Sequence, residues 1–95
     1  MKKILIIRFS SIGDIVLTTP VIRCLKNKYP DSEIHYLTKF SFKSVIESNP
    51  YIEKVWTIKQ DVKEVIGKLE KVGFDHVIDL HKNIRSKQVC FKLKT

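Results

Sequence analysis

The stretch KILIIRFSSIGD, residues Lys3–Asp14, decides the fold that we expect for this chain. Its first half, Lys3–Arg8, is an almost continuous apolar run, which is typical of a short strand buried on both faces of a sheet. Two serines follow, and Gly13 and Asp14 end the run before a helical pattern begins. A buried strand that leads through a short polar loop into a helix indicates an α/β fold with a parallel sheet.

The rest of the chain continues this alternation of strand and helix. The segment Asp61–Val72 is the clearest helix, because its apolar residues follow helical spacing. Asp61 with Glu64 forms a capping box at its start, and Gly73 is a natural stop. We expect further strands at Glu33–Thr38, Lys54–Ile58 and Asp75–Leu80, and further helical segments at Ile15–Tyr29, at Phe42–Glu47 and from Ile84 onward.

Pro20 lies inside the helical pattern of Ile15–Tyr29. Because proline removes a helical hydrogen bond, either the helix kinks at this residue or a short turn precedes a separate helix. In the second case Thr19 caps that helix and Pro20 takes its first position. The sequence leaves both arrangements open.

The order of these elements predicts a three-layer, Rossmann-like α/β domain with four parallel strands and helices on both faces. The usual strand order is 3-2-1-4, and ligands bind beyond the carboxyl ends of the strands, where the first and fourth strands are neighbours. The loops that follow these two strands, Ser10–Asp14 and Asp79–Ser86, are both polar. We therefore expect the two loops to lie together and to form a ligand site.

Asp14 is the first candidate in this site. An aspartate at the start of a helix often only complements the helix dipole or caps the turn. At this position its carboxylate can also accept a proton from a hydroxyl that attacks an electrophile. Ser10, Ser11 and Gly13 offer hydroxyl and backbone N–H groups to a polar or anionic ligand, and glycine permits close approach. Arg8 is expected to neutralise or to position Asp14.

The second loop supplies further polar candidates. Asp79 ends the fourth strand, where a carboxylate commonly fixes the neighbouring loop; a contact with ligand is the alternative. His81, Asn83 and Arg85 can face a ligand, and the guanidinium of Arg85 suits bidentate recognition of a carboxylate or phosphate. An internal ion pair of Arg85 with Asp79 or Asp14 is the competing interpretation.

Several common chemistries are not supported by the sequence. The first loop has too few glycines for the dinucleotide fingerprint GxGxxG, and no GK[ST] follows it, so we do not expect it to hold a nucleotide. His35 and His76 lie within strand patterns and are interpreted as structural, and three scattered histidines predict no metal site. Neither Cys24 nor Cys90 has the neighbours of a catalytic triad. Trp56 and the five phenylalanines are interpreted as core or packing residues, and they do not form a stacking platform for nucleic acid bases.

The net charge of +8 favours anionic partners such as phosphates, nucleotides, nucleic acid or an acidic membrane surface. A solvated, lysine-rich surface explains the same charge without any partner. The 95 residues allow one domain at most, and the two cysteines form no disulfide framework, which fits a reducing compartment. The apolar run near the N-terminus is too short for a signal peptide or a membrane span, so we expect a cytoplasmic protein.

The combination of SSIGD, TTP, KYP and DLHKNIRS at these spacings resembles glycosyltransferase family 9, the ADP-heptose:lipopolysaccharide heptosyltransferases. The similarity continues through NPYIEKVW and FDHVIDL and covers nearly the whole chain. It implies a GT-B enzyme of two Rossmann-like domains, in which the N-terminal domain receives the acceptor and the C-terminal domain binds the ADP-sugar. Residues 1–95 then form a partial acceptor-side domain without the donor domain, which we expect to be inactive alone.

The resemblance also implies roles for single residues. Asp14 is the expected general base of an inverting transfer. The acceptor, the lipid A–Kdo inner core, is expected to contact the loop after the fourth strand, at His81, Asn83, Arg85 and Ser86. The resemblance implies no metal and no cofactor, and it implies work at the cytoplasmic face of the inner membrane. Lys82 departs from the family pattern, in which this position is commonly small.

Two other functions are compatible with the sequence. One is a small non-catalytic Rossmann-like or flavodoxin-like module that binds an anionic ligand or nucleic acid through the basic tail from Lys82 onward. The other is a degenerate remnant without function. Salt-sensitive binding to generic DNA or RNA would favour the module. The favoured prediction is the acceptor-binding part of a heptosyltransferase-like enzyme, with no nucleic acid partner.

Overall fold

The four strands of the chain form one parallel sheet in the order β3-β2-β1-β4. The computed structural model describes residues 2–9, 11–59 and 63–81. The strands are β1 (Lys3–Ile7), β2 (Glu33–Lys39), β3 (Lys54–Ile58) and β4 (His76–Asp79). The predicted α/β class and the predicted strand order are confirmed.

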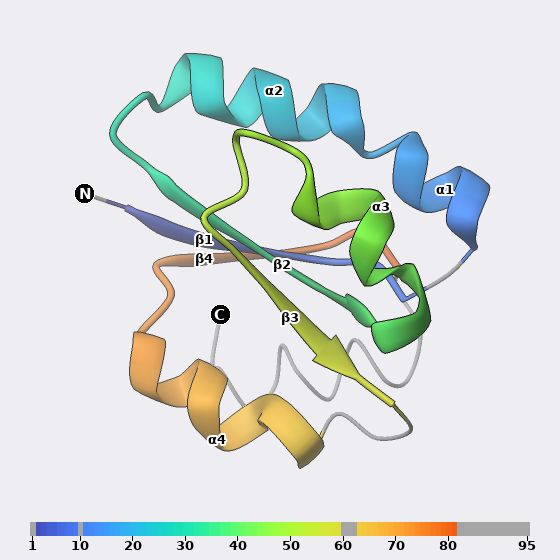
Figure 1. The fold of residues 1–95 in the computed structure, drawn as a ribbon. Coiled ribbons are helices and arrows are strands. Elements are labelled where there is room, and N and C mark those ends of the chain that lie inside the picture. Colours follow the sequence, from blue (N-terminus) through green and yellow to red (C-terminus); the bar gives the residue numbers. More distant parts are fainter. Residues whose placement is uncertain (1, 10, 60–62, 82–95) are drawn as a thin grey trace.

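Helices cover both faces of the sheet and complete three layers (Figure 1). On one face lies α4 (Lys63–Val72). The other face carries α1 (Ile12–Val16), α2 (Thr19–Lys28) and α3 (Lys43–Glu47), and a short 3₁₀ helix, η1 (Phe40–Phe42), precedes α3. The carboxyl ends of the strands, where ligands bind in folds of this kind, lie on the right in Figure 1.

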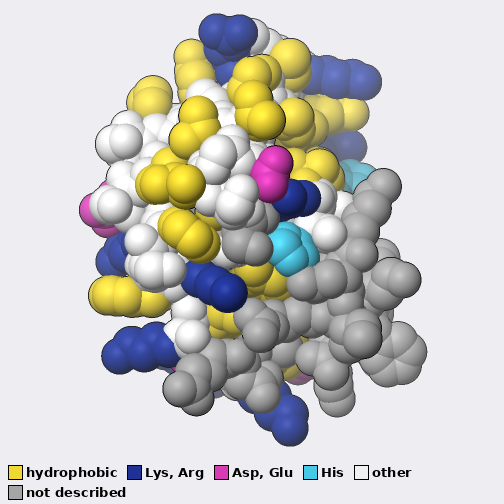
Figure 2. Space-filling model, turned by 90° about the vertical axis from the view of Figure 1, so that its right-hand side faces the viewer, with side chains coloured by type: hydrophobic (Ala, Val, Ile, Leu, Met, Phe, Trp, Pro, Cys, Tyr) yellow, Lys and Arg dark blue, Asp and Glu magenta, His cyan; other side chains and the backbone are white. Residues whose placement is uncertain are grey.

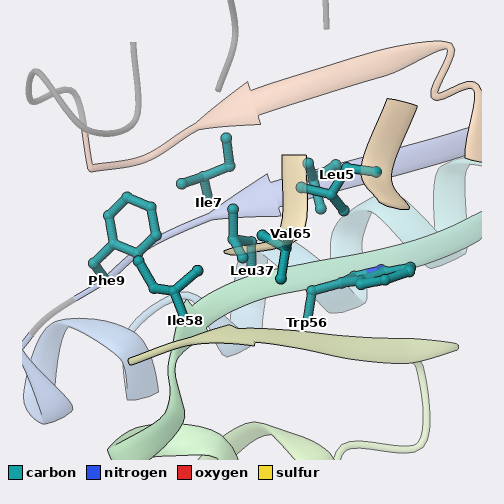
Figure 3. Packing of buried hydrophobic residues seen from close by; sticks show 8 residues of the cluster. Leu5, Ile7, Phe9, Leu37, Trp56, Ile58 and Val65 are labelled. Carbon is teal, nitrogen blue, oxygen red and sulfur yellow. The ribbon is translucent and has the colours of Figure 1, made fainter. Parts of the chain in front are cut away.

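The central strand β1 divides the core into two clusters, because successive side chains of a strand point to opposite faces. Leu5 and Ile7 point toward α4, and Ile6 points toward the other helices. Figure 3 shows the cluster under α4, to which β2, β3 and the residue Phe9 also contribute. Since Ile4–Ile7 are all buried, the predicted burial of this strand on both faces is confirmed.

The segment Ile15–Tyr29 is not one helix, and the break occurs before Pro20. Thr18 lies at the N-cap position of α2, and its hydroxyl donates to the Ile15 carbonyl at 2.6 Å. The alternative with a separate second helix is therefore correct, with two corrections. The residue before the helix is Thr18 rather than Thr19, and Pro20 takes the second helical position, where it also needs no N–H partner.

The remaining boundaries agree with the sequence apart from small shifts. The helical piece expected at Phe42–Glu47 begins with η1 and continues as α3. Gly73 has φ of 72° and ends α4, as predicted, because a left-handed residue at this place favours glycine. Phe9 is buried and Phe42 and Phe74 pack against the core clusters, as expected, whereas Phe40 is 52% exposed and lies beside the ammonium group of Lys59. Asp61 and the helix expected from Ile84 lie outside the described residues.

Candidate functional site

The loops after β1 and β4 meet at the carboxyl end of the sheet. Arg8 donates from Nη1 to the Leu80 carbonyl at 2.6 Å, and the Phe9 N–H donates to Nδ1 of His81 at 3.3 Å. The Leu80 N–H donates to the Ile7 carbonyl at 3.1 Å, which extends the pairing of the two strands. Figure 2 shows this end of the molecule, with an acidic, a basic and a histidine side chain close together. The predicted juxtaposition of the two loops is confirmed for the parts of them that the structure describes, which include Asp14 in the first and residues 79–81 in the second.

Asp14 lies in the first turn of α1, and its contacts all fall on one carboxylate oxygen. Oδ2 accepts from the Ser11 hydroxyl at 3.0 Å and from the Ser11 N–H at 3.4 Å, and Nη2 of Arg8 lies 3.0 Å from the same oxygen. Among the residues that the structure describes, no hydrogen bond or ion pair is formed by Oδ1. The side chain is 50% exposed, so its second oxygen is accessible to a ligand.

These contacts favour the ionised form of Asp14. The Ser11 hydroxyl, and then the Ser11 backbone N–H, lower the pKa of the Asp14 carboxyl below its ordinary value, and the positive charge of Arg8 adds to the effect. Asp14 is therefore a carboxylate at neutral pH. It can accept a hydrogen bond or a proton without first losing one.

Arg8 connects the two loops through its guanidinium. One terminal nitrogen holds the Leu80 carbonyl after β4, and the other pairs with Asp14 after β1. The planar fork of an arginine fixes both partners at once, which a lysine could not do. Arg8 was expected to neutralise Asp14 or to position it, and the ion pair is consistent with either role. The Leu80 carbonyl is a backbone group, so no side-chain pattern pointed to it.

Asp79 and His81 arrange the second loop. Oδ1 of Asp79 accepts the His81 N–H at 3.0 Å, as expected for a carboxylate that fixes the turn after a strand. Since the Phe9 N–H can only donate, Nδ1 of His81 is the acceptor and the neutral ring carries its hydrogen on Nε2. The ring also meets Phe9 edge to face, with centroids 5.4 Å apart. His81 is thus held beside Asp14's loop.

Of the other predicted site residues, the structure describes Ser11 and Gly13. The hydroxyl and N–H of Ser11 are directed at Asp14. Gly13 lies inside α1, and a Cβ atom added there would meet open space, so the fold itself does not require a glycine. Ser10, Asn83, Arg85 and Ser86 lie outside the described residues, so their predicted contacts with a ligand stay predictions.

Three other features could carry a function: a metal-binding cluster, a membrane-spanning helix and a separate groove. No group of three or more metal-binding side chains occurs among residues 2–9, 11–59 and 63–81. In the same part of the chain, no helix is both long enough and apolar enough to span a bilayer. A groove of about 470 Å³ lies between α2 and β4, but its lining from Asp75 to Ile78 places it at the amino end of β4, away from Asp14.

Comparisons with known proteins point to one family. The chain matches no protein-family model. It is 30% identical over 90 residues to lipopolysaccharide heptosyltransferase 1 of Campylobacter coli, covering 88% of this chain and 26% of that protein. A glycosyl transferase family 9 structure from Veillonella parvula superposes with a TM-score of 0.81 and 30% identity, over 97% of this chain and 29% of that one. This chain is a relative of the family 9 heptosyltransferases.

Two further matches agree with this relationship. Lipopolysaccharide heptosyltransferase 3 of Escherichia coli is 36% identical over 66 residues, which cover 70% of this chain and 19% of that protein. The E. coli ADP-heptose lps heptosyltransferase II superposes with a TM-score of 0.85 over 99% of this chain and 28% of that one, and its 20% identity supports the fold alone. The chain spans about a quarter of the length of the curated relatives it matches. The family resemblance noted in the motifs is confirmed.

Two lysines and a phenylalanine at the carboxyl end of the sheet were not predicted from the sequence as candidate site residues. Lys39 ends β2, Phe40 begins η1, and Lys59 follows β3, so all three lie at the same carboxyl edge as Asp14. The signal was present, because each lysine directly follows or ends an apolar strand pattern. The rule for ligand sites in such sheets points only to the loops after β1 and β4, and so it does not predict a role for residues after β2 and β3. Exposed apolar side chains also occur on α1, directly after it and near the start of α2: Ile12, Val16, Leu17 and Val21.

Proposed function

We propose that this chain is the acceptor-side part of a heptosyltransferase, which transfers a heptose from ADP-heptose to the inner core of lipopolysaccharide with inversion. The observation that carries the proposal is the carboxylate of Asp14, whose Oδ2 is held by Ser11 and Arg8 while Oδ1 has no partner among the described residues. The family relationship and the position at the carboxyl end of the sheet support the same role.

In this reaction Asp14 is the general base. The hydroxyl oxygen of the acceptor attacks the anomeric carbon of the heptose, and the bond from that carbon to the phosphate oxygen of ADP breaks. The hydroxyl proton passes to the Asp14 carboxylate, and ADP leaves with the electron pair of the broken bond. Attack opposite the leaving group inverts the anomeric carbon. The donor is assigned to a second domain of the GT-B arrangement, outside residues 1–95.

Ser11 and Arg8 position the base in this proposal. By occupying Oδ2 they leave Oδ1 directed to the acceptor, which restricts the carboxylate to one geometry. They also lower its pKa, which keeps it ionised but weakens it as a base. The arrangement suits a reaction in which the proton moves late, after the acceptor oxygen has begun to bond to carbon and its hydroxyl has become more acidic.

The surroundings of the site fit a lipid-linked acceptor. Ile12 and Val16 of α1, the helix that carries Asp14, and Leu17 directly after it are exposed apolar side chains, and the chain has a net charge of +8. An apolar border with an excess of basic residues suits contact with an anionic membrane surface. The proposed location is therefore the cytoplasmic face of the inner membrane, with the acceptor presented from the bilayer.

The decisive experiment is Asp14→Asn in the full polypeptide that carries residues 1–95, with transfer from ADP-heptose measured by release of ADP. Asparagine keeps the size and shape of the side chain but cannot accept the proton. We expect kcat to fall by about 10²–10⁴-fold, the usual contribution of a general base.

Asp31→Asn is the matched control, because Asp31 is an exposed carboxylate in the turn before β2. It should transfer heptose at the wild-type rate. A D14N protein that unfolds like the wild type and retains near-normal kcat would exclude Asp14 as the base.

A further inference from the structure

His81 lies where the loop after β4 meets the loop after β1, and the proposed reaction assigns it no step. Its Nδ1 accepts the Phe9 N–H at 3.3 Å, and its own backbone N–H donates to Oδ1 of Asp79 at 3.0 Å. The ring also packs edge to face on Phe9, with centroids 5.4 Å apart. The histidine is thus attached to both loops, and its ring is the part that reaches from one to the other.

The Phe9 N–H that His81 holds lies close to Asp14 along the chain. It belongs to the peptide unit between Arg8 and Phe9. Nη2 of Arg8 lies 3.0 Å from Oδ2 of Asp14, and Ser11, two residues beyond Phe9, donates its hydroxyl to the same oxygen at 3.0 Å. Since both partners of the carboxylate lie within two residues of this peptide unit, a shift of the peptide displaces them.

Two further bonds hold the same segment. The Arg8 N–H donates to the Leu37 carbonyl of β2 at 3.1 Å, and Nη1 of Arg8 donates to the Leu80 carbonyl at 2.6 Å. Both acceptors are carbonyl oxygens, which do not gain a proton near neutral pH. The bond to His81 differs from them, because its acceptor is a ring nitrogen that can.

The bond requires the neutral form of the His81 ring. Because a backbone N–H can only donate, Nδ1 must keep its lone pair, and the hydrogen of the ring lies on Nε2. A second proton on the ring takes this lone pair and turns the acceptor into a donor that faces the Phe9 N–H. Histidine ordinarily gains this proton between about pH 5 and 8. Protonation therefore breaks the attachment and deprives a part-buried N–H of this acceptor.

Three charged side chains adjoin this attachment in the described part of the chain: Asp79, Arg8 and Asp14. Asp79 holds the His81 backbone, Arg8 holds the neighbouring Leu80 carbonyl, and Asp14 pairs with Arg8. The pKa of Asp14 is lowered below its ordinary value of 3.8, so its carboxylate stays ionised throughout the range in which histidine titrates. A loss of activity in that range therefore does not come from protonation of the base.

We infer that neutral His81 is a positioning residue for Asp14: its Nδ1 holds the Phe9 N–H and so fixes the segment that supplies both partners of the carboxylate. A proton on Nδ1 releases this segment, and transfer slows although the base is still ionised. The residue acts through the backbone of the protein and needs no contact with the substrates. The inference rests on the proposed function for the reaction that Asp14 performs.

The attachment is tested in the 95-residue chain by NMR titration from about pH 8 to about pH 5. At the upper limit, the ¹⁵N signals of the His81 ring should show a hydrogen on Nε2 and an unprotonated Nδ1. As the ring gains its second proton, the Phe9 amide proton should move upfield with the same midpoint, because its hydrogen bond is lost. A ring hydrogen on Nδ1 at the upper limit, a Phe9 signal that does not follow the ring, or a ring that stays neutral throughout would overturn the inference.

The effect on catalysis is tested in the full polypeptide that carries residues 1–95, with heptose transfer measured by release of ADP across the same pH range. Wild-type kcat should fall on the acid side, through the midpoint of the His81 ring. His81→Asn places an amide oxygen near the position of Nδ1 and does not titrate, so it should keep most of the wild-type kcat in alkaline buffer and lose the acid limb. His81→Phe keeps a ring against Phe9 but offers no acceptor, and it should lower kcat about tenfold at every pH with little change in KM.

His76→Asn is the matched control, because His76 is an exposed histidine of the same strand, β4. It should keep both the wild-type kcat and the acid limb. An acid limb that persists unchanged in H81N, or an H81F protein with the wild-type kcat, would overturn the positioning role. If H81F does not fold, the pH profile of H81N and the titration of the wild-type chain decide the question.

Failure of this inference and failure of the proposed function give different results. Heptose transfer that depends on Asp14 but not on His81 would remove the positioning role and keep the base. Absence of transfer by the wild type, with the Phe9 and His81 signals still titrating together, would remove the proposed function and leave the attachment between the two loops.

Discussion

Two polar clusters of this molecule are built from similar parts but are arranged in opposite ways. In the first, Trp56 donates to Nδ1 of His35 at 2.9 Å, and Nε2 of His35 meets Glu33 at 2.6 Å. His35 is 4% exposed. In the second, the site cluster, Ser11 and Arg8 hold an Asp14 side chain that is 50% exposed. Each cluster contains a carboxylate whose pKa is lowered by its neighbours.

The two clusters differ in whether a hydrogen-bonding atom remains accessible to a ligand. Because an indole N–H can only donate, Nδ1 of His35 must accept, and Nε2 carries the hydrogen that Glu33 accepts. Both ring nitrogens of His35 are therefore used inside the protein. Asp14 keeps Oδ1 without a partner among the described residues and presents it at the carboxyl end of the sheet. Saturated hydrogen bonding indicates a structural cluster, and an accessible unused acceptor indicates a binding or catalytic one.

The largest effect that we expect is a loss of stability when His35 of the structural cluster is replaced by alanine. This change leaves the buried Trp56 N–H without its acceptor and opens a cavity beside Phe74, whose ring lies 5.0 Å from that of His35. We expect the free energy of unfolding to fall by about 2–4 kcal/mol, measured by urea denaturation. His76→Ala, at an exposed histidine of β4, is the control and should have little effect. Equal losses in both variants would contradict the structural role of His35.

The sequence predicted the sheet because every strand carries its own local signal. The continuous run of β1 indicates a buried strand without information from the rest of the chain, and the topology then follows from general rules of parallel sheets. The same rules predicted that the loops of Asp14 and Asp79 would meet.

Other features were not predictable because they depend on contacts between distant residues. The bond between Trp56 and His35 joins β3 to β2, and the contact of Arg8 with Leu80 uses a backbone carbonyl. His35 was correctly interpreted as structural, but its partners were not named. The residue before the second helix was misplaced by one position. Thr18, which takes that position, also contacts the hydroxyl of Tyr36 at 3.0 Å. That contact is set by the sheet and not by helix propensity.

The next expected effect is a pH dependence of stability that comes from the structural cluster. The hydrogen bond with His35 lowers the pKa of Glu33 from its ordinary value of 4.5. Ionised Glu33 therefore contributes to stability above pH 4.5, and this contribution is lost as the pH falls through the lowered pKa. We expect Glu33→Gln to be less stable than the wild type near neutral pH and to approach it in acid.

Urea denaturation at about pH 7 and about pH 3 measures this difference. Glu70→Gln, at an exposed glutamate of α4, is the control, and it should track the wild type at both pH values. A difference between E33Q and the wild type that is the same at both pH values would show that Glu33 acts through packing rather than through its charge.

A smaller effect concerns the ionisation of Asp14 in the site cluster. The Ser11 hydroxyl is the largest cause of its lowered pKa, ahead of the Arg8 charge. We expect Ser11→Ala and Arg8→Gln each to raise the pKa of Asp14, as measured by ¹³C NMR titration of the carboxyl carbon. Ser44→Ala, at an exposed serine of α3, should leave it unchanged. An unchanged pKa in either variant would show that the residue replaced does not stabilise the ionised form of Asp14.

The smallest expected effects concern two helical glycines, one beside the site cluster and one away from it. Gly13 lies beside Asp14 in α1, Gly67 lies in the interior of α4, and a Cβ atom added at either would meet open space. Alanine at position 67 should raise the free energy of unfolding by about 0.5–1 kcal/mol, because glycine in a helix costs that much relative to alanine. Gly13→Ala should not weaken the fold. If a ligand approaches the backbone there, as the sequence suggested, only G13A will raise KM for the acceptor, and an unchanged KM in both variants would show that Gly13 has no part in the site.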